Sequence, residues 1–194
     1  MATTDPTVTN SNTTPIITDS APIVTATPEA TIRADGNSAV INRSALLAGT
    51  SDPDGDPLSI QVDPATLPAG VTYNHVDGST VTVTTTTYYG FNQTITIPAV
   101  DTLTLDTSAA DYSALAQGEV QDITVRYAVS DGTLSTPAQA VFHVVGVNDA
   151  PIVSGPLSAQ VTEGDAPVTV DALAQAHDAD HGAVLSVVAP PPPP

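Results

Sequence analysis

Apolar and polar residues alternate along several short segments of this 194-residue chain. The clearest are "VTVTT" (81–85), "QTITI" (93–97), "ITVRYAV" (123–129) and "AQAVFHVV" (138–145). A period of two places alternate side chains on one face of a β-strand, so each segment is predicted to be a strand with one face buried. The side chains predicted to face the core are Ile123, Val125, Tyr127, Val129, Ala140, Phe142 and Val144.

Asp-Gly pairs separate these strand candidates. "VDGST" (76–80) and "SDGTL" (130–134) are predicted to be turns, because Gly and Asp tolerate the backbone angles of tight hairpins. Short strands joined by such turns predict an all-β fold, an antiparallel β-sandwich. The helical exceptions are "SAADYSALAQGE" (108–119), read as a capped turn or short helix, and a single turn at residues 44–47.

An internal repeat runs through the chain. "TDSAPIV" (18–24) and "VNDAPIV" (147–153) match with an offset of 129 residues. "SALLAGTSDPDGDPLSI" (44–60) then matches "DALAQAHDADHGAVLSV" (171–187) with an offset of 126 to 127. A period of about 130 residues indicates tandem structural units.

The repeat predicts the domain organisation. Residues 1–19 are rich in Thr, Asn and Pro and are read as a leader or linker. Residues 20–148 are expected to form one complete β-sandwich, and 149–194 the first part of a truncated second unit, with a linker at 147–151. The truncated unit is expected to be poorly ordered or to pair its edge with another chain.

Charge narrows the classes of partner. The chain has 21 acidic and 3 basic residues, a formal net charge of −18, and no lysine or cysteine. Nucleic acid and anionic lipid would be repelled, so neither is an expected partner. No apolar run approaches the ~20 residues that span a bilayer, so membrane insertion is not expected. The charge favours hard divalent cations, and a merely solvated acidic surface is the alternative.

An Asp-x-Asp motif recurs in both units. "DPDGD" (52–56) carries carboxylates on alternate residues, and "HDADHG" (177–182) keeps Asp178 and Asp180 at the matching positions. Such spacing lets several oxygens converge on one hard cation. An EF-hand loop is excluded, because Asp63 and Pro64 stand where its final glutamate is required.

Three motifs together resemble a known family: "VNDAPIV", the Asp-x-Asp motif about thirty residues later, and "DYSALAQGEVQDITVRYAVSDGTLS" (111–135). Residues 20–194 are similar to the cadherin-like and VCBS repeats of large Gram-negative RTX-type adhesins. The resemblance implies tandem Ig-like or cadherin-like sandwiches with Ca²⁺ at their junctions, type I secretion and display on the bacterial cell surface. It implies an extender role in adhesion and biofilm formation, with neighbouring repeats of the same chain as partners.

The resemblance also implies candidate Ca²⁺ ligands. At the junction they are Asn148, Asp149, Asp178, Asp180 and Glu163. At the upstream end the matching positions are Asp19, Asp52 and Asp54, with Glu29 as a further candidate. Asp131 of "VSDG" either lies near such a site or only shapes its turn. The structural alternative for Asn148 and Asp149 is an Asx turn before proline.

Other chemistry finds little support in the sequence. No nucleophile motif, phosphate-binding loop or paired glutamates indicate an enzyme. His177 and His181 flank "DAD" but lack a further firm ligand for a transition metal, and His75 and His143 are read as strand residues. The alternative function is a Ca²⁺-dependent lectin-like module that recognises exopolysaccharide, with Tyr88, Tyr89 and Phe91 as its aromatic cluster. Besides neighbouring repeats, polysaccharide and a host or abiotic surface are candidate partners.

Overall fold

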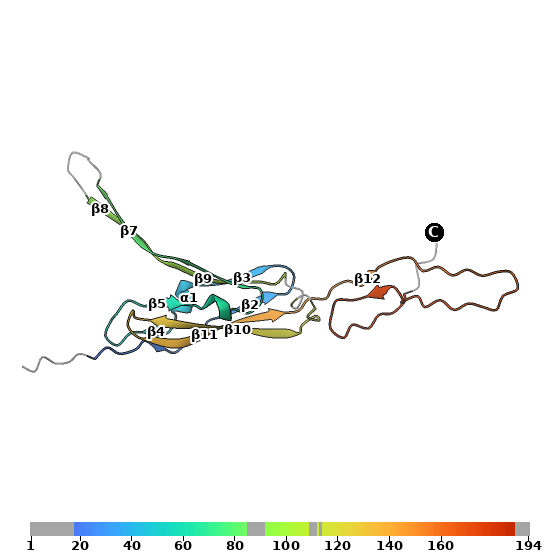
Figure 1. Cartoon of the computed structure of the whole chain (residues 1–194), viewed down its shortest axis with the longest axis horizontal. Helices are drawn as coiled ribbons and strands as arrows, with labels where there is room; N and C mark the ends of the chain where they lie inside the picture. Colours follow the sequence, from blue (N-terminus) through green and yellow to red (C-terminus); the bar gives the residue numbers. More distant parts are fainter. Residues whose placement is uncertain (1–17, 85–91, 109–111, 113, 189–194) are drawn as a thin grey trace, which may run out of the picture.

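A computed structural model describes residues 18–84, 92–108, 112 and 114–188 of the chain. A two-sheet β-sandwich forms its centre (Figure 1). A hairpin projects from this sandwich, and the second unit continues from the end opposite the N-terminal segment. Among the described residues, no helix has the length and apolar character needed to cross a bilayer.

The elements are almost all strands. They are β1 (Ile23–Val24), β2 (Glu29–Arg33), β3 (Ser38–Asn42), α1 (Arg43–Leu46), β4 (Thr50–Ser51), β5 (Ser59–Gln61), a 3₁₀ turn (Pro64–Thr66), β6 (Val71–Val76), β7 (Ser79–Thr84), β8 (Asn92–Ile97), β9 (Val100–Asp106), β10 (Val120–Ser130), β11 (Ser135–Val145), β12 (Ile152–Val153) and β13 (Ala176–His177).

Two sheets pack face to face. One has the order β2-β11-β10-β5 and the other the order β3-β9-β6. The predicted all-β sandwich is therefore confirmed. All strand pairs in the described part are antiparallel except β2 and β11, which run parallel with Phe142 opposite Ala30. The alternation of apolar residues could not reveal this exception, since it is the same in both directions.

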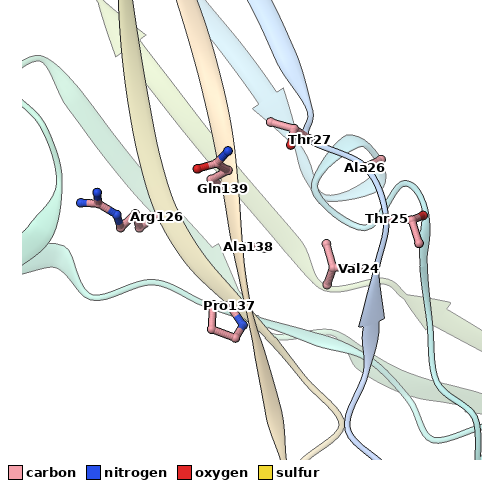
Figure 2. Close-up of a pocket in the computed structure, with 8 residues that line it drawn as sticks. All are labelled: Val24, Thr25, Ala26, Thr27, Arg126, Pro137, Ala138 and Gln139. Atoms are coloured by element: carbon pink, nitrogen blue, oxygen red, sulfur yellow. The ribbon is translucent and has the colours of Figure 1, made fainter.

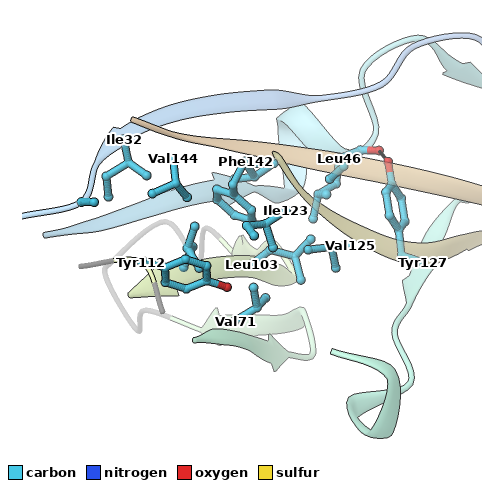
Figure 3. Packing of buried hydrophobic residues seen from close by; sticks show 14 of the residues in the cluster. Ile32, Leu46, Val71, Leu103, Tyr112, Ile123, Val125, Tyr127, Phe142 and Val144 are labelled. Carbon is cyan, nitrogen blue, oxygen red and sulfur yellow. Dashed lines mark hydrogen bonds between the residues drawn. The ribbon is translucent and has the colours of Figure 1, made fainter. Parts of the chain in front are cut away.

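The core lies between the two sheets (Figure 3). Every side chain predicted to face inward on β10 and β11 is buried, and Val125, Phe142 and Val144 are 0% exposed. Leu103 and Leu105 of β9 cover them from the opposite sheet. The core lacks Trp and is filled mainly by aliphatic side chains, as expected from the composition.

Local structure at the turns partly follows the sequence. The predicted turn at 130–134 reverses the chain between β10 and β11, with Ser130 opposite Ser135. The single turn at 44–47 is found as α1, capped by Asn42, whose side chain accepts a hydrogen bond from the N–H of Ala45. The predicted turn or helix at 108–119 lies partly outside the described residues, and residues 114–119 form turns and irregular backbone.

The predicted turn at 76–80 does not reverse the chain. β6 pairs with β9, and β7 then continues outward to pair with β8, so Asp77 and Gly78 join two segments of one long hairpin. A β-carbon on Gly78 would lie 2.7 Å from the backbone nitrogen of Ala99. Glycine is required here because the two backbones approach closely, and not because the chain turns back.

The second unit repeats the opening contacts of the first. β1 pairs with β4 through Ile23 and Ser51, and β12 pairs with β13 through Ile152 and His177. These pairs differ by the same 129 and 126 residues found in the sequence. The following backbone bonds repeat as well: Thr25 to Gly49 over 3.0 Å, and Ser154 to Gln175 over 2.9 Å.

The apolar side chains of the second unit remain largely exposed. Val161, which the offset matches to buried Ile32, is 66% exposed, and Val184 is 92% exposed. In the first unit β11 lies beside Ile32 and buries it. The described part of the second unit contains only β12 and β13, so no strand covers the equivalent positions.

Candidate functional site

Carboxylates gather at the end of the sandwich where the first unit begins. The loop after β4 is shaped by Asp52, whose Oδ1 accepts the N–H groups of Asp54 over 2.9 Å and of Asp56 over 3.1 Å. Gly55 takes a φ of 85° in this loop, which favours glycine. The second carboxylate oxygen of Asp52 is buried and has no hydrogen-bond partner in the described part of the chain.

Asp131 reaches the same end of the sandwich from the turn between β10 and β11. Its Oδ1 accepts the N–H groups of Thr133 and Leu134, each over 2.7 Å. Its Oδ2 is buried without a partner among the described residues. Asp131 therefore shapes its turn and also presents a spare oxygen, so the two alternatives left open by the sequence are compatible.

Four carboxylates lie close enough to Asp56 to act on its pKa. Loss of solvation raises it above the ordinary value, and repulsion from Asp52, Asp19, Asp131 and Asp54 raises it further. Three of these four neighbours, Asp19, Asp52 and Asp54, are sequence candidates. Asp56 and Asp131 join them because the loop after β4 and the β10–β11 turn meet at one end of the sandwich.

The junction between the units contains a second group of candidates. The N–H of Asp149 donates to Oδ2 of Asp180 over 3.0 Å, and the N–H of Asp180 donates to Oδ1 of Asp178 over 2.9 Å. The remaining oxygen of Asp180 is buried and has no partner in the described chain. A cleft of about 610 Å³ is lined by all three carboxylates and by Asn148.

Asn148 makes a local contact. Its side-chain amide donates to the backbone oxygen of Asp149 over 2.7 Å. Its side-chain oxygen is left for another partner, so the contact is compatible with a role as a neutral ligand.

Glu119 is a junction residue that the sequence analysis did not select. Its Oε2 accepts the N–H of Ala116 over 3.0 Å and lies 3.3 Å from Nδ1 of His181. The N–H of His181 also donates to the backbone oxygen of Ala114 over 2.9 Å. The second unit therefore touches the end of the first sandwich directly. The signal that could have identified Glu119 is its place in the "ALAQGE" motif.

Two glutamate candidates lie apart from these groups. Glu163 is exposed and forms no hydrogen bond or ion pair with any described residue of the junction. Glu29 lies on β2, where its carboxylate is 3.5 Å from Nε2 of His143. The sequence match placed both glutamates near the sites, but each belongs to a strand or turn that runs elsewhere.

Three of the four histidines have carboxylate partners. Asp122 lies 2.6 Å from Nδ1 of His143, and Asp101 lies 2.6 Å from Nδ1 of His75. Both histidines are strand residues as expected, but the sequence did not predict these partners, because the register of strand pairing brings them together. His181 faces Glu119, and His177 lies on β13.

The fit to a metal ion rests on the unpartnered oxygens. Within the described ranges, no group of three or more His, Cys, Asp or Glu side chains is placed so that it could hold a metal ion. Asp52, Asp131 and Asp180 nevertheless each bury an oxygen that has no donor. A buried carboxylate oxygen without a donor is costly, and hard cations prefer oxygen ligands, so a cation such as Ca²⁺ would satisfy these oxygens.

A further surface groove contains none of the candidate ligands. A groove of about 370 Å³ lies beside the link from β1 to β2 and is lined by Thr25, Arg126 and Gln139, among others (Figure 2). The aromatic cluster of Tyr88, Tyr89 and Phe91, on which the lectin-like alternative depended, lies outside the described residues.

Comparisons with known proteins give no family. No protein-family model matches the chain, and no curated protein matches it. Two solved structures show partial similarity: the endo-fucoidan hydrolase MfFcnA4 from glycoside hydrolase family 107, and a variant of that enzyme. Sequence identity is 15% and 16%, the TM-score is 0.31 for both, and the match covers 66% of this chain but only 14% of each enzyme chain. Similarity at this level carries no argument about activity.

Proposed function

We propose that this chain is a calcium-stabilised extender repeat of a bacterial cell-surface adhesin. Its role is structural and not catalytic: it spaces a terminal binding domain from the cell and thereby serves adhesion and biofilm formation. The observation that supports this proposal is the set of unpartnered buried oxygens at both ends of the sandwich, on Asp52 and Asp131 at one end and on Asp180 at the other.

Electrostatics explains why such a protein needs cations. The chain carries a formal net charge of −18, and several of its carboxylates gather around Asp56 at one end of the sandwich and around Asp180 at the other. Like charges at this spacing repel one another and oppose a fixed hinge. A bound divalent cation supplies opposite charge and oxygen coordination, and would be held by Asp52, Asp54, Asp56 and Asp131 at one end and by Asp149, Asp178 and Asp180 at the other.

The two ends have equivalent contacts, which supports a tandem role. The hydrogen bond from Asp149 to Asp180 corresponds to one from Ser20 to Asp54 over 2.8 Å, with the same offsets of 129 and 126 residues. A unit with the same loop at both of its boundaries is suited to head-to-tail stacking. The partners proposed are therefore neighbouring repeats of the same chain, secreted and displayed at the cell surface.

The direct test is thermal unfolding with calcium or with a chelator, combined with small-angle scattering of the full chain. Calcium should raise Tm and lengthen or stiffen the particle. At a free calcium concentration about 100-fold above Kd, each site adds about 2.7 kcal/mol of stability. Magnesium at equal ionic strength controls for screening.

Variants assign the effect to the proposed ligands. Asp180→Asn should reduce the change in particle length caused by calcium, because the junction loses a charged ligand. Asp165→Asn is the matched control, since Asp165 accepts a hydrogen bond from Thr162 in a turn of the second unit, away from the junction. Equal melting curves and equal dimensions with calcium and chelator would exclude the proposal.

A further inference from the structure

A polar network centred on one buried carboxylate lies apart from both groups of candidate ligands. Its centre is Asp101 at the start of β9, which is 0% exposed. Asp101 Oδ1 accepts a hydrogen bond from the hydroxyl of Tyr73 over 2.6 Å, and Oδ2 pairs with the guanidinium of Arg43. Arg43 also donates to the backbone oxygen of Leu58 over 2.8 Å. Asp101 is thus a fixed anion anchored by α1 and β6.

His75 connects this network to the link between β6 and β7. Its Nδ1 lies 2.6 Å from Oδ1 of Asp101, and its Nε2 lies 2.9 Å from Oδ1 of Asp77. A neutral imidazole has one N–H and can donate to only one of these carboxylates. Both contacts are hydrogen bonds only when His75 is a doubly protonated cation.

The pairing of the long hairpin is interrupted where Asp77 lies. Val76 pairs with Val100 at the end of the β6–β9 ladder, and the β7–β8 ladder begins with Ser79 opposite Ile97. Gly78 and the link through Pro98 and Ala99 lie between the two ladders. Proline cannot donate a backbone hydrogen bond to a partner strand, so the hairpin is weakest at this point.

We propose that this interruption is a pH-sensitive hinge, which holds the projecting β7–β8 hairpin in one orientation while His75 is protonated and releases it when His75 is neutral. The charged groups that face His75 are Asp101 from β9, Asp77 from the link and, through Asp101, Arg43 from α1. Tyr73, its neighbour on β6, stacks on it with ring centroids 6.2 Å apart.

The chemistry gives the direction of the change. Neutral His75 keeps one donor, and the buried anion Asp101 retains it because that site is the less solvated of the two. Nε2 then becomes an acceptor that faces the carboxylate of Asp77, whose side chain is 94% exposed. Two acceptors repel, so Asp77 turns to water and the link at the base of the hairpin loses its side-chain contact with His75.

The pKa values agree with this geometry. The hydrogen bonds that His75 donates to Asp101 and then to Asp77 raise the pKa of His75 above its ordinary value of 6.5. Burial by itself raises the pKa of Asp101, but hydrogen bonds from Tyr73, His75 and Arg43 outweigh burial and lower it. The hairpin is therefore held in one orientation at pH 6.5 and below. It is released as pH rises through the raised pKa of His75.

The test measures the orientation of the hairpin directly. The chain contains no cysteine, so the substitutions Val40→Cys on β3 and Thr84→Cys at the end of β7 create two unique sites for spin labels. Pulsed electron paramagnetic resonance then gives the distribution of distances between sandwich and hairpin. The distribution should be narrow at about pH 5.5 and broader or displaced at about pH 9.

Two substitutions at Asp77 make the test specific without touching the core. Asp77→Ala removes the attachment and should give a broad distribution at both pH values. Asp77→Asn should give a narrow one at both, because its amide donates to neutral His75 and its carbonyl accepts from charged His75. His143→Gln, on the opposite sheet, should keep the response of the parent.

Two results would overturn the hinge. One is an unchanged distance distribution between the two pH values in the parent chain. The other is a parent-like response in Asp77→Ala, which would show that the change arises elsewhere. All measurements are made with chelator present, so calcium binding does not contribute, and the outcome is independent of the proposed extender role.

Discussion

The backbone N–H of Ser20 donates a hydrogen bond to Oδ2 of Asp54 over 2.8 Å, and thereby fixes the entry of the chain against the loop after β4. Asp149 makes the same bond to Asp180 at the start of the second unit. A main-chain donor satisfies one oxygen of each carboxylate and holds its side chain in place. The first residues of each unit are thus held in place by an aspartate, and the proposal assigns cation binding to the same aspartates.

Asp131→Asn should separate the two roles of Asp131. Asparagine keeps an oxygen for the N–H groups of Thr133 and Leu134, so the turn is retained, but the charge is lost. With chelator the variant should be as stable as the parent or more stable, because the repulsion that raises the pKa of Asp56 is reduced. With calcium its gain in Tm should be smaller than that of the parent, as measured by scanning calorimetry.

Asp63→Asn is the matched control for Asp131→Asn. Asp63 also shapes a turn, by accepting the N–H of Ala65 over 3.0 Å, but it is not among the carboxylates that act on Asp56. Its gain in Tm with calcium should equal that of the parent. A full calcium response in Asp131→Asn would remove Asp131 from the proposed site.

The sequence predicts this fold well where a pattern is local. The alternation on β10 and β11 correctly identifies the buried faces, including Phe142, because a strand side chain has only two possible directions. The Asp-Gly pair at Asp131 correctly identifies a hairpin. At Asp77 the same pair of residues does not reverse the chain, because β7 continues outward from β6 to pair with β8. No local sequence signal predicts that pairing.

The candidate site residues were likewise predicted where a local motif marks them and missed where they depend on tertiary contacts. The repeat offset leads to Asp54 and Asp180, and the structure brings each to the entry of its unit. Glu119 was missed because it comes from the junction end of the first sandwich, far in sequence from the Asp-x-Asp motif that it approaches. The contact of His75 with Asp101 depends on the register of β6 against β9, which a single sequence does not specify.

Phe142→Ala should destabilise the sandwich strongly. Phe142 is 0% exposed, and removing a buried aromatic ring loses its burial and leaves a cavity, at a cost of about 3–5 kcal/mol. Small domains have a total stability of about 5–15 kcal/mol, so the urea midpoint should fall by a large fraction. Val120→Ala, at a site 57% exposed, should leave the midpoint nearly unchanged, and equal midpoints for the two variants would contradict the assigned core.

His143→Gln should flatten the dependence of stability on pH. The hydrogen bond to Asp122, together with the nearby Glu29, raises the pKa of His143. A raised pKa in the folded state gives stability that is fully present below the unfolded value of about 6.5 and is lost as pH rises through the folded value. Tm of the parent should therefore fall between about pH 6 and pH 9 more steeply than Tm of the variant. Parallel curves would show that this ion pair contributes nothing.

Gly146→Ala should loosen the junction without removing any charge. A β-carbon at Gly146 would lie 2.1 Å from the backbone oxygen of Ala116 and 2.5 Å from that of Leu115, and neither backbone can yield as a side chain does. The N–H of Gly146 also donates to the backbone oxygen of Glu119 over 2.8 Å, so the segment that bears Glu119 must shift. Overpacking of this kind costs about 1–3 kcal/mol.

The displaced segment carries Ala114, which accepts the N–H of His181. Amide exchange at His181 should therefore become faster in Gly146→Ala, and the calcium-dependent change in particle length should shrink although every proposed ligand is intact. Gly155→Ala is the control, since its added β-carbon meets nothing within 4 Å. If Gly146→Ala lowers stability but leaves exchange at His181 unchanged, the sandwich and the second unit are not coupled through this segment. The junction must then be positioned by the linker and the proposed cation alone.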